Sequence, residues 1–325
     1  MATLSFASLP GAVGTDLTRR PNPRSAPTGR QRHRIAVATT PSRQPPDWRS
    51  PVTESSRDDL VLFHRDGAVA VITLNRPEAM NAVNSAVSTA VGAALEDLAS
   101  DPTLRVGVLT GAGRAFCAGA DLKALAAGQS FLSPEHPEWG FAGIVQHYID
   151  KPLIAAVNGF ALGGGTEIVL ACDLAILSTQ ATLGLPEVTR GLIAGAGGLL
   201  RLPDQMPPKL AAAAVLTGDP IPPPTALQWG LVNAVVPPED VLAEATRLAH
   251  RIAANAPLAV TATKRIMAHR RNFGSDWAEA MWAMNDRELA SILASEDAKE
   301  GPTAFAEKRS PRWTGGLERS TAGTR

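Results

Sequence analysis

Two glutamates, Glu167 and Glu187, have the chemistry and the setting of an acid–base pair. Glu167 ends the small-residue stretch Ala161–Glu167 in the first turn of an expected helix, and Glu187 lies in the apolar stretch Leu183–Val188. Together they could hold and deprotonate a water and protonate a carbon. Apolar surroundings would raise the pKa of Glu187, which suits a general acid. The alternative, an exposed or helix-dipole-paired glutamate, is favoured for either residue taken singly.

Two glycine-rich loops could supply hydrogen-bond donors next to these carboxylates. Gly163–Gly165 opens an expected helix, where bare N–H groups and the helix dipole could hold a carbonyl oxygen and stabilise negative charge on it. The loop 111–122 also leads from a strand to a helix, and an N–H near Ala120 could complete an oxyanion hole with two donors. A tight strand-to-helix turn is the alternative for each loop. The loop Gly163–Gly165 does not match a phosphate-binding or dinucleotide-binding pattern.

Other polar or reactive residues favour structural roles. Asp121 is placed to cap a helix over 122–127. Cys117 is interpreted as a small buried residue, because nothing nearby in sequence would lower its pKa. The histidines do not group at metal-ligand spacing, so no metal is expected. The aromatic stretch within 128–142, with Phe131, Trp139 and Phe141, could line an acyl pocket or belong to the core.

The chemistry-bearing loops need an α/β framework to position them. Short β-rich runs at 60–63, 69–74, 106–110, 153–157 and 174–177 alternate with helical stretches, one of which begins at Asn84 or Ser85 and ends near Ala99. This alternation predicts parallel strands joined by helical crossovers. Beyond about Glu239 the strands stop, and the runs 239–254, 257–272, 275–294 and 297–308 are expected to be helices.

Composition excludes several classes of protein. The chain has 325 residues, 45% of them hydrophobic, with 31 basic and 31 acidic residues, so it can bury a large core and is not a general nucleic-acid binder. Two cysteines cannot build a disulfide framework. The best apolar stretch, Ile168–Leu177, is interrupted by Asp173, so no membrane span is expected.

The ends of the chain differ from the middle. Residues 1–57 are rich in Arg, Pro and Ser, lack an apolar period and are expected to be disordered. They are interpreted as a tail or as the result of a start codon placed too far upstream. The alternative is a mitochondrial transit peptide, but Pro21, Pro23 and Pro27 would break the amphipathic helix that it needs. Residues 310–325 are expected to form a second tail.

Five segments in order resemble the crotonase superfamily, also called the enoyl-CoA hydratase/isomerase family, over about residues 60–313. They are Leu74–Ala82, Phe116–Leu122, Asn158–Glu167, Gly191–Pro203 and Ala304–Arg309. The resemblance implies a spiral of ββα turns over 58–255 and a C-terminal helical region over 256–309. The resemblance further implies that this region builds trimers, often paired as hexamers.

The resemblance also assigns site residues. It implies an oxyanion hole made by the N–H groups of Ala120 and Gly164, with Glu167 and Glu187 as the catalytic glutamates. Phe305 and Lys308 would reach the CoA of a neighbouring subunit. The positions that would contact the substrate or CoA of the same subunit are Ala118, Asp121, Leu122, Lys123 and Gly163. Three features depart from the family pattern. In the segment 194–201, Ala194 replaces a usual Pro and Leu199-Leu200-Arg201 replaces Thr-Gln-Arg. The loop 128–142 does not align, and the N-terminal 57 residues have no counterpart in the family core.

The expected function is hydration of a 2-enoyl-CoA to a 3-hydroxyacyl-CoA, in fatty-acid β-oxidation or related acyl-CoA degradation. No cofactor is expected, since CoA arrives with the substrate, and the expected location is the cytoplasm. An isomerase, decarboxylase or hydrolase would use the same oxyanion hole, but both glutamates are present, which favours a hydratase. A non-catalytic acyl-CoA-binding protein is disfavoured because neither a glutamate nor a glycine loop is lost.

Overall fold

The computed structural model describes residues 60–315, and the expectations for residues 1–57 and 316–325 lie outside that range. The strands are β1 (Val61–Asp66), β2 (Val69–Leu74), β3 (Val106–Gly111), β4 (Ala115–Cys117), β5 (Leu153–Val157), β6 (Phe160–Leu162), β7 (Leu174–Ser178), β8 (Thr182–Gly184) and β9 (Ala234–Val236). The α-helices are α1 (Ser85–Ser100), α2 (Leu122–Ala126), α3 (Gly164–Ala171), α4 (Gly198–Gln205), α5 (Pro208–Thr217), α6 (Pro223–Gln228), α7 (Val241–Ala253), α8 (Pro257–His269), α9 (Glu279–Leu293) and α10 (Glu296–Ala306). Short 3-10 turns are η1 (Pro77–Ala79), η2 (Pro137–Trp139), η3 (Phe141–Gly143), η4 (Pro186–Arg190), η5 (Pro238–Asp240) and η6 (Arg270–Phe273).

The main sheet has six strands in the order β1-β2-β3-β5-β7-β9. β1 and β2 form an antiparallel hairpin at Asp66, and every later pairing in this sheet is parallel. The predicted α/β class is therefore confirmed. The five expected strands are present, whereas β9 was not predicted from the sequence.

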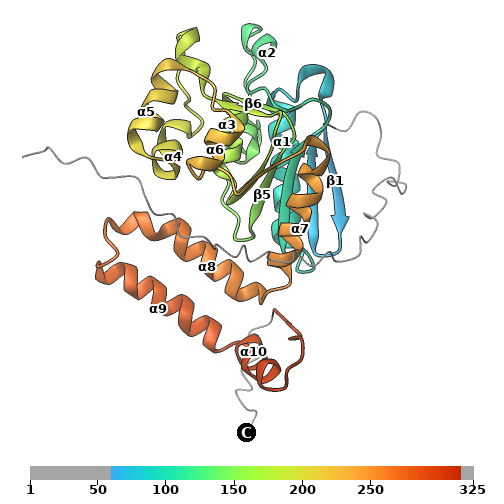
Figure 1. Cartoon of the computed structure of the whole chain (residues 1–325), viewed down its shortest axis with the longest axis vertical. Coiled ribbons are helices and arrows are strands. Elements are labelled where there is room, and N and C mark those ends of the chain that lie inside the picture. The colour runs from blue at the N-terminus through green and yellow to red at the C-terminus, as the bar shows by residue number, and fades with distance from the viewer. Residues whose placement is uncertain (1–59, 316–325) are drawn as a thin grey trace, which may run out of the picture. The chain divides into compact units, whose positions relative to one another are not determined.

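Alternation along the strands divides the core into two layers. Ala70, Ile72 and Leu74 of β2 point to the face covered by α1, whereas Val69 and Val71 point to the face covered by α7 (Figure 1). The period of two along each strand sends successive side chains to opposite faces. On α7 the buried residues Val241, Ala245, Ala249 and Ala253 recur every four positions and make one apolar stripe.

The helices after α7 follow the predicted pattern, with ends shifted by a few residues. α8 and α9 run side by side (Figure 1). Arg265 of α8 pairs with Glu288 of α9 at 2.6 Å and with Asp150 at 2.5 Å, so one guanidinium joins both helices to the strand-bearing part. Lys264 adds an ion pair to Asp173 at 2.7 Å.

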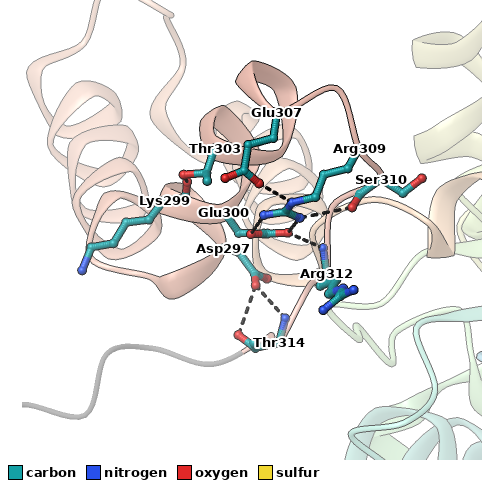
Figure 2. A network of polar contacts seen from close by, with 9 residues as sticks. All are labelled: Asp297, Lys299, Glu300, Thr303, Glu307, Arg309, Ser310, Arg312 and Thr314. Carbon is teal, nitrogen blue, oxygen red and sulfur yellow. Dashed lines mark hydrogen bonds and ion pairs between the residues drawn. The ribbon is translucent and has the colours of Figure 1, made fainter.

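Residues 310–315 are held by α10 through carboxylates (Figure 2). Asp297 accepts hydrogen bonds from the N–H of Thr314 at 2.7 Å and from its hydroxyl at 3.1 Å. Glu300 pairs with Arg309 and accepts the N–H of Arg312 at 2.6 Å. These bonds hold the Arg309 side chain and hydrogen bonding lowers the pKa of Glu300 to about 2. Part of the segment expected to be a tail thus folds back onto α10.

Candidate active site

A second, three-stranded sheet brings the predicted site residues to one edge. Its strands pair in the order β4-β6-β8, and both pairings are parallel. The loops that follow parallel strands leave the sheet at the same edge, where ligands of open α/β sheets bind. Ala120 follows β4, Gly164 follows β6 and Glu187 follows β8. This sheet therefore places both glycine-rich loops and one glutamate together.

The first loop presents the N–H of Ala120. Val83 donates its N–H to Gly119 O and accepts the N–H of Asp121, each at 2.8 Å, so this bridge fixes the loop from one side. Within residues 60–315 the N–H of Ala120 has no hydrogen-bond partner. Gly119 sits at φ +92°, a conformation that L side chains rarely adopt. The loop geometry leaves the Ala120 N–H for a ligand.

The second loop lies directly against the first. A side-chain carbon on Gly119 would stand 3.3 Å from Gly164 N and 2.9 Å from Leu162 O. Gly163 donates its N–H to Gly184 O at 2.9 Å, whereas the Gly164 N–H, in the first turn of α3, has no partner within the described residues. Two unpaired donors on touching loops are what an oxyanion hole requires.

Glu167 lies in the first turn of α3 with only 3% of its surface exposed. Its Oε1 accepts the N–H of Gly198, at the start of α4, at 2.8 Å. Burial raises the pKa of this carboxyl, and the charge of Glu187 raises it further, while the Gly198 N–H acts in the opposite direction. The result is a carboxyl held in place by backbone and with a raised pKa, a property expected of a general base.

Glu187 lies on η4, with its Oε1 3.0 Å from where a side-chain carbon on Gly163 would be. Its Oε2 is buried and has no hydrogen-bond partner in the described part of the chain. Burial is also the main cause that raises the pKa of Glu187. An unpartnered buried carboxylate oxygen is rare and marks a functional site more often than a structural one. The charge of Glu187 raises the pKa of Glu167, so the two carboxyls lie close enough to interact.

The other residues predicted to contact substrate or CoA lie in the two loops or at the start of α2. Ala118 and Gly163 belong to the loops, and the Ala118 N–H donates to Met80 O. Leu122 and Lys123 are exposed at the start of α2. Asp121 caps α2 by accepting the N–H groups of Lys123 and Ala124 and also pairs with Arg76 at 3.1 Å. The capping interpretation of Asp121 is therefore confirmed.

Among residues 60–315, the structure gives no contact that brings Phe305 or Lys308 to these loops. Phe305 is 87% exposed on α10, Lys308 follows α10, and α10 packs on α9. Their role toward the CoA of a neighbouring subunit stays a prediction.

Sequence reasoning missed the residues that support the loops. The side chain of Asn81 donates to Ala112 O at 2.9 Å and to Ala115 O at 2.8 Å, and Arg76 donates to Ala82 O at 2.6 Å. The two Asn81 bonds tie the segment after β2 to the start of β4, which precedes the first loop, and the Arg76 bond closes that segment on itself. The sequence signal for these supports is the motif Leu74–Ala82, to which the resemblance assigns no role.

Phe141 was also missed as a support. Its ring covers Gly164 so closely that a side-chain carbon there would overlap it, and Phe131 meets it edge-on at 5.4 Å. Phe141 is 5% exposed and belongs to the main core. Of the two interpretations of the loop 128–142, this residue fits the core.

Cys117 is buried, and desolvation raises the pKa of its thiol to about 12, so the predicted structural role agrees with its setting. Among residues 60–315, no three His, Cys, Asp or Glu side chains gather where they could hold a metal ion. No helix in this range is long and apolar enough to cross a membrane.

The sequence profile described as Enoyl-CoA hydratase/isomerase matches residues 64–316. The chain belongs to this family. It is 43% identical to a carnitinyl-CoA dehydratase of Salmonella arizonae, over 77% of this chain and 97% of that protein. The crystal structure of an enoyl-CoA hydratase from Mycobacterium tuberculosis H37Rv matches with a TM-score of 0.74 and 46% identity, over 79% of this chain and 99% of that one.

A carnitinyl-CoA hydratase structure from Mycobacterium avium is 55% identical, with a TM-score of 0.63, over 78% of this chain and 98% of that one. These findings confirm the predicted family and the crotonase-like fold. Hydration and dehydration are two directions of one reaction, so the relatives' names confirm the prediction of a hydratase-type enzyme and do not favour the isomerase alternative.

Proposed function

We propose that Glu167 and Glu187 catalyse the addition of water to a 2-enoyl-CoA, with the thioester oxygen held by the N–H groups of Ala120 and Gly164. The observation that carries the proposal is a buried carboxyl, Glu167, and a partly buried one, Glu187, both with raised pKa, beside two unpaired backbone donors. A donor pair alone would serve many reactions on this scaffold. The second carboxyl supplies the proton that hydration needs.

The steps follow from the positions of these groups. Glu167 orients a water and removes its proton as the oxygen bonds to Cβ. Negative charge then grows on the thioester oxygen, where two fixed N–H donors stabilise it more in the transition state than in the ground state. Glu187, whose raised pKa favours the protonated form, donates its proton to Cα. The reverse reaction, loss of water, uses the same groups. The proposed reaction needs no cofactor beyond the CoA of the substrate.

The acyl group has two candidates. A 2-enoyl-CoA of simple chain follows from the similarity to the mycobacterial enoyl-CoA hydratase. Carnitinyl-CoA is the second candidate, because the curated relatives at 43% identity are named carnitinyl-CoA dehydratase. The departures at Ala194 and in the loop 128–142 are where we expect the preference to be set.

We also propose a homotrimer or a pair of trimers. Trp282, Leu289 and Leu293 are spaced by seven and four residues on α9, which puts them on one helix face, and each is at least half exposed. Exposed apolar patches of this kind mark interfaces. In such an assembly Phe305 and Lys308 would approach a neighbouring subunit's CoA. We also propose a cytoplasmic location, which the similarity to proteins of bacteria supports.

The test is loss of the conjugated enoyl-thioester absorbance when purified protein meets short, long, branched and aromatic 2-enoyl-CoAs, with carnitinyl-CoA assayed for the reverse reaction. Wild type should form a 3-hydroxyacyl-CoA by mass. Glu167→Gln and Glu187→Gln should each lower kcat by about 10²–10⁴-fold. Glu239→Gln, at an exposed glutamate, is the matched control and should leave kcat unchanged. Absence of turnover with every thioester, despite binding, would overturn the proposal.

A further inference from the structure

We propose that Arg201 is a positioning residue. It bonds α4, whose Gly198 N–H holds the Glu167 carboxylate, to the segment Phe141–Val145, which packs against the proposed oxyanion hole. This inference rests on the proposed roles of Glu167 and Gly164. Among residues 60–315 the guanidinium of Arg201 hydrogen-bonds to Val145 O and to neither loop, so we treat it as acting through other residues and not as catalytic itself. Its hydrogen bond crosses from α4 to the chain just after η3.

The first step is the hold of α4 on Glu167. Gly198, the first residue of α4, donates its N–H to Glu167 Oε1 at 2.8 Å. A shift of this helix end would move the carboxyl with it. Arg201 lies in the first turn of α4, where its own N–H donates to Gly197 O at 2.9 Å. Arg201 therefore restrains the position of Gly198, whose N–H holds the carboxylate of the proposed base Glu167.

The second step is the bond from α4 to the segment Phe141–Val145. Nη2 of Arg201 donates to Val145 O at 2.5 Å. Val145 is buried, and its N–H donates to Phe141 O at 3.3 Å. Phe141 in turn covers Gly164, whose N–H is the second proposed oxyanion donor. One chain of contacts thus runs from the base to the oxyanion hole by way of Arg201.

The segment Phe141–Val145 is rigid enough to serve as an anchor. Gly143 lies so close to α1 that a side-chain carbon on it would overlap Ser88 O. Ala142 is fully buried at φ +56°, a conformation that costs energy and persists only where packing enforces it. A guanidinium bonded to this segment is therefore bonded to a fixed point.

The positive charge of Arg201 should affect a measurable quantity, the pKa of Glu167, which a purely structural residue would leave unchanged. Glu187 and Arg201 are the charged groups that face Glu167; Arg190 faces Glu187, and the thiol of Cys172 faces Arg201. The guanidinium lowers the pKa of Glu167, against burial and against Glu187. Loss of the positive charge should raise this pKa further, so the base would become active only at higher pH.

The experiment compares Arg201→Met, Arg201→Lys and Arg105→Met. Arg105 donates to Ala253 O at 2.8 Å, so Arg105→Met removes the same kind of bond away from the site. Arg201→Met should lower kcat by about 10²-fold, as expected for a misplaced catalytic group, with a smaller change in KM. It should also move the acidic limb of the kcat/KM profile to higher pH. Arg201→Lys should keep that limb in place while kcat stays reduced, and Arg105→Met should change neither.

A carboxyl ¹³C NMR titration, assigned with Glu167→Gln, separates this inference from the proposed function because it needs no turnover. The Glu167 pKa should be higher in Arg201→Met than in wild type. An unchanged pKa and an unchanged acidic limb would overturn the inference, as would equal losses in Arg201→Met and Arg105→Met. If wild type hydrates no 2-enoyl-CoA, the proposed function fails, and the titration still decides the role of Arg201.

Discussion

Glu187 carries the clearest conflict between stability and activity at the scale of single residues. Its buried Oε2 has no hydrogen-bond partner among residues 60–315, and burial raises its pKa above the unfolded value. A raised carboxyl pKa means that the folded state binds its proton more tightly than the unfolded state. The ionised group therefore destabilises the fold above the folded pKa, and this penalty disappears as the pH falls below the unfolded value of about 4.3.

We therefore expect Glu187→Gln to be more stable than wild type at pH 8, although it loses activity. The gain should be on the order of 1 kcal/mol, less than for full desolvation because the side chain is only partly buried. Urea unfolding at a series of pH values measures the difference, which should shrink toward zero below about pH 4. Glu239→Gln serves as the control. A gain that is the same at every pH would contradict the assignment of the penalty to the charge.

At this scale the sequence predicted the reactive groups but not their supports. The structure brings Glu167, Glu187, Ala120 and Gly164 close together, and their catalytic roles stay a prediction. The hydrogen bond from the Gly198 N–H to Glu167 could not be predicted from the sequence, because the donor is a backbone N–H that almost any residue type provides. The hydrogen bond from Arg201 to Val145 O joins residues 56 positions apart in the sequence, and no spacing rule predicts such a contact.

At the scale of elements, long segments were predictable and short ones were not. α7 to α10 lie within a few residues of the expected ranges because each is long enough to show an apolar period or a proline at its start. β4, β6 and β8 have three residues each, too few to show an alternation. Yet these three strands build the edge that carries the site, so the sequence located the loops without explaining why they meet.

The packing of η2 on α1 gives a prediction at this scale. Trp139 covers Gly92 in the middle of α1 and is stacked between His136 and His147, at 3.9 and 4.6 Å between ring centroids. Helix propensity alone would make Gly92→Ala stabilising by about 1 kcal/mol. Because the new methyl group would overlap the indole, we expect a loss of about 1–3 kcal/mol instead.

The sign should reverse when the ring is absent. In a Trp139→Ala background, Gly92→Ala should be neutral or stabilising, since only the helix propensity remains. Chemical denaturation of wild type, both single variants and the double variant gives the coupling free energy between the two positions. Equal losses from Gly92→Ala in both backgrounds would show that Trp139 does not set the requirement for glycine.

At the scale of the whole molecule, several large apolar side chains on and just before α9 stay exposed in the structure of residues 60–315. Trp277 is 88% exposed just before α9, and along the helix Trp282, Leu289 and Leu293 are 54%, 50% and 65% exposed. Formal charge is balanced, so nothing in the net charge opposes the approach of a second copy. The sequence indicated helices in this region, but the exposure of these side chains depends on packing that only the structure shows.

If this surface joins subunits, charges placed on it should separate them without unfolding the chain. Leu289→Arg and Leu293→Arg replace side chains that are already half exposed, so the fold of each subunit should tolerate them. The molecular mass measured by sedimentation equilibrium should then fall from that of a trimer or hexamer toward the 34.0 kDa of a single chain, while the circular dichroism spectrum stays unchanged. Ser291→Arg adds the same charge at an exposed position on the opposite face of α9 and should leave the assembly intact. Assembly that survives both leucine variants, or that is lost equally in Ser291→Arg, would place the interface elsewhere, because charges buried without partners at a subunit contact cost several kcal/mol.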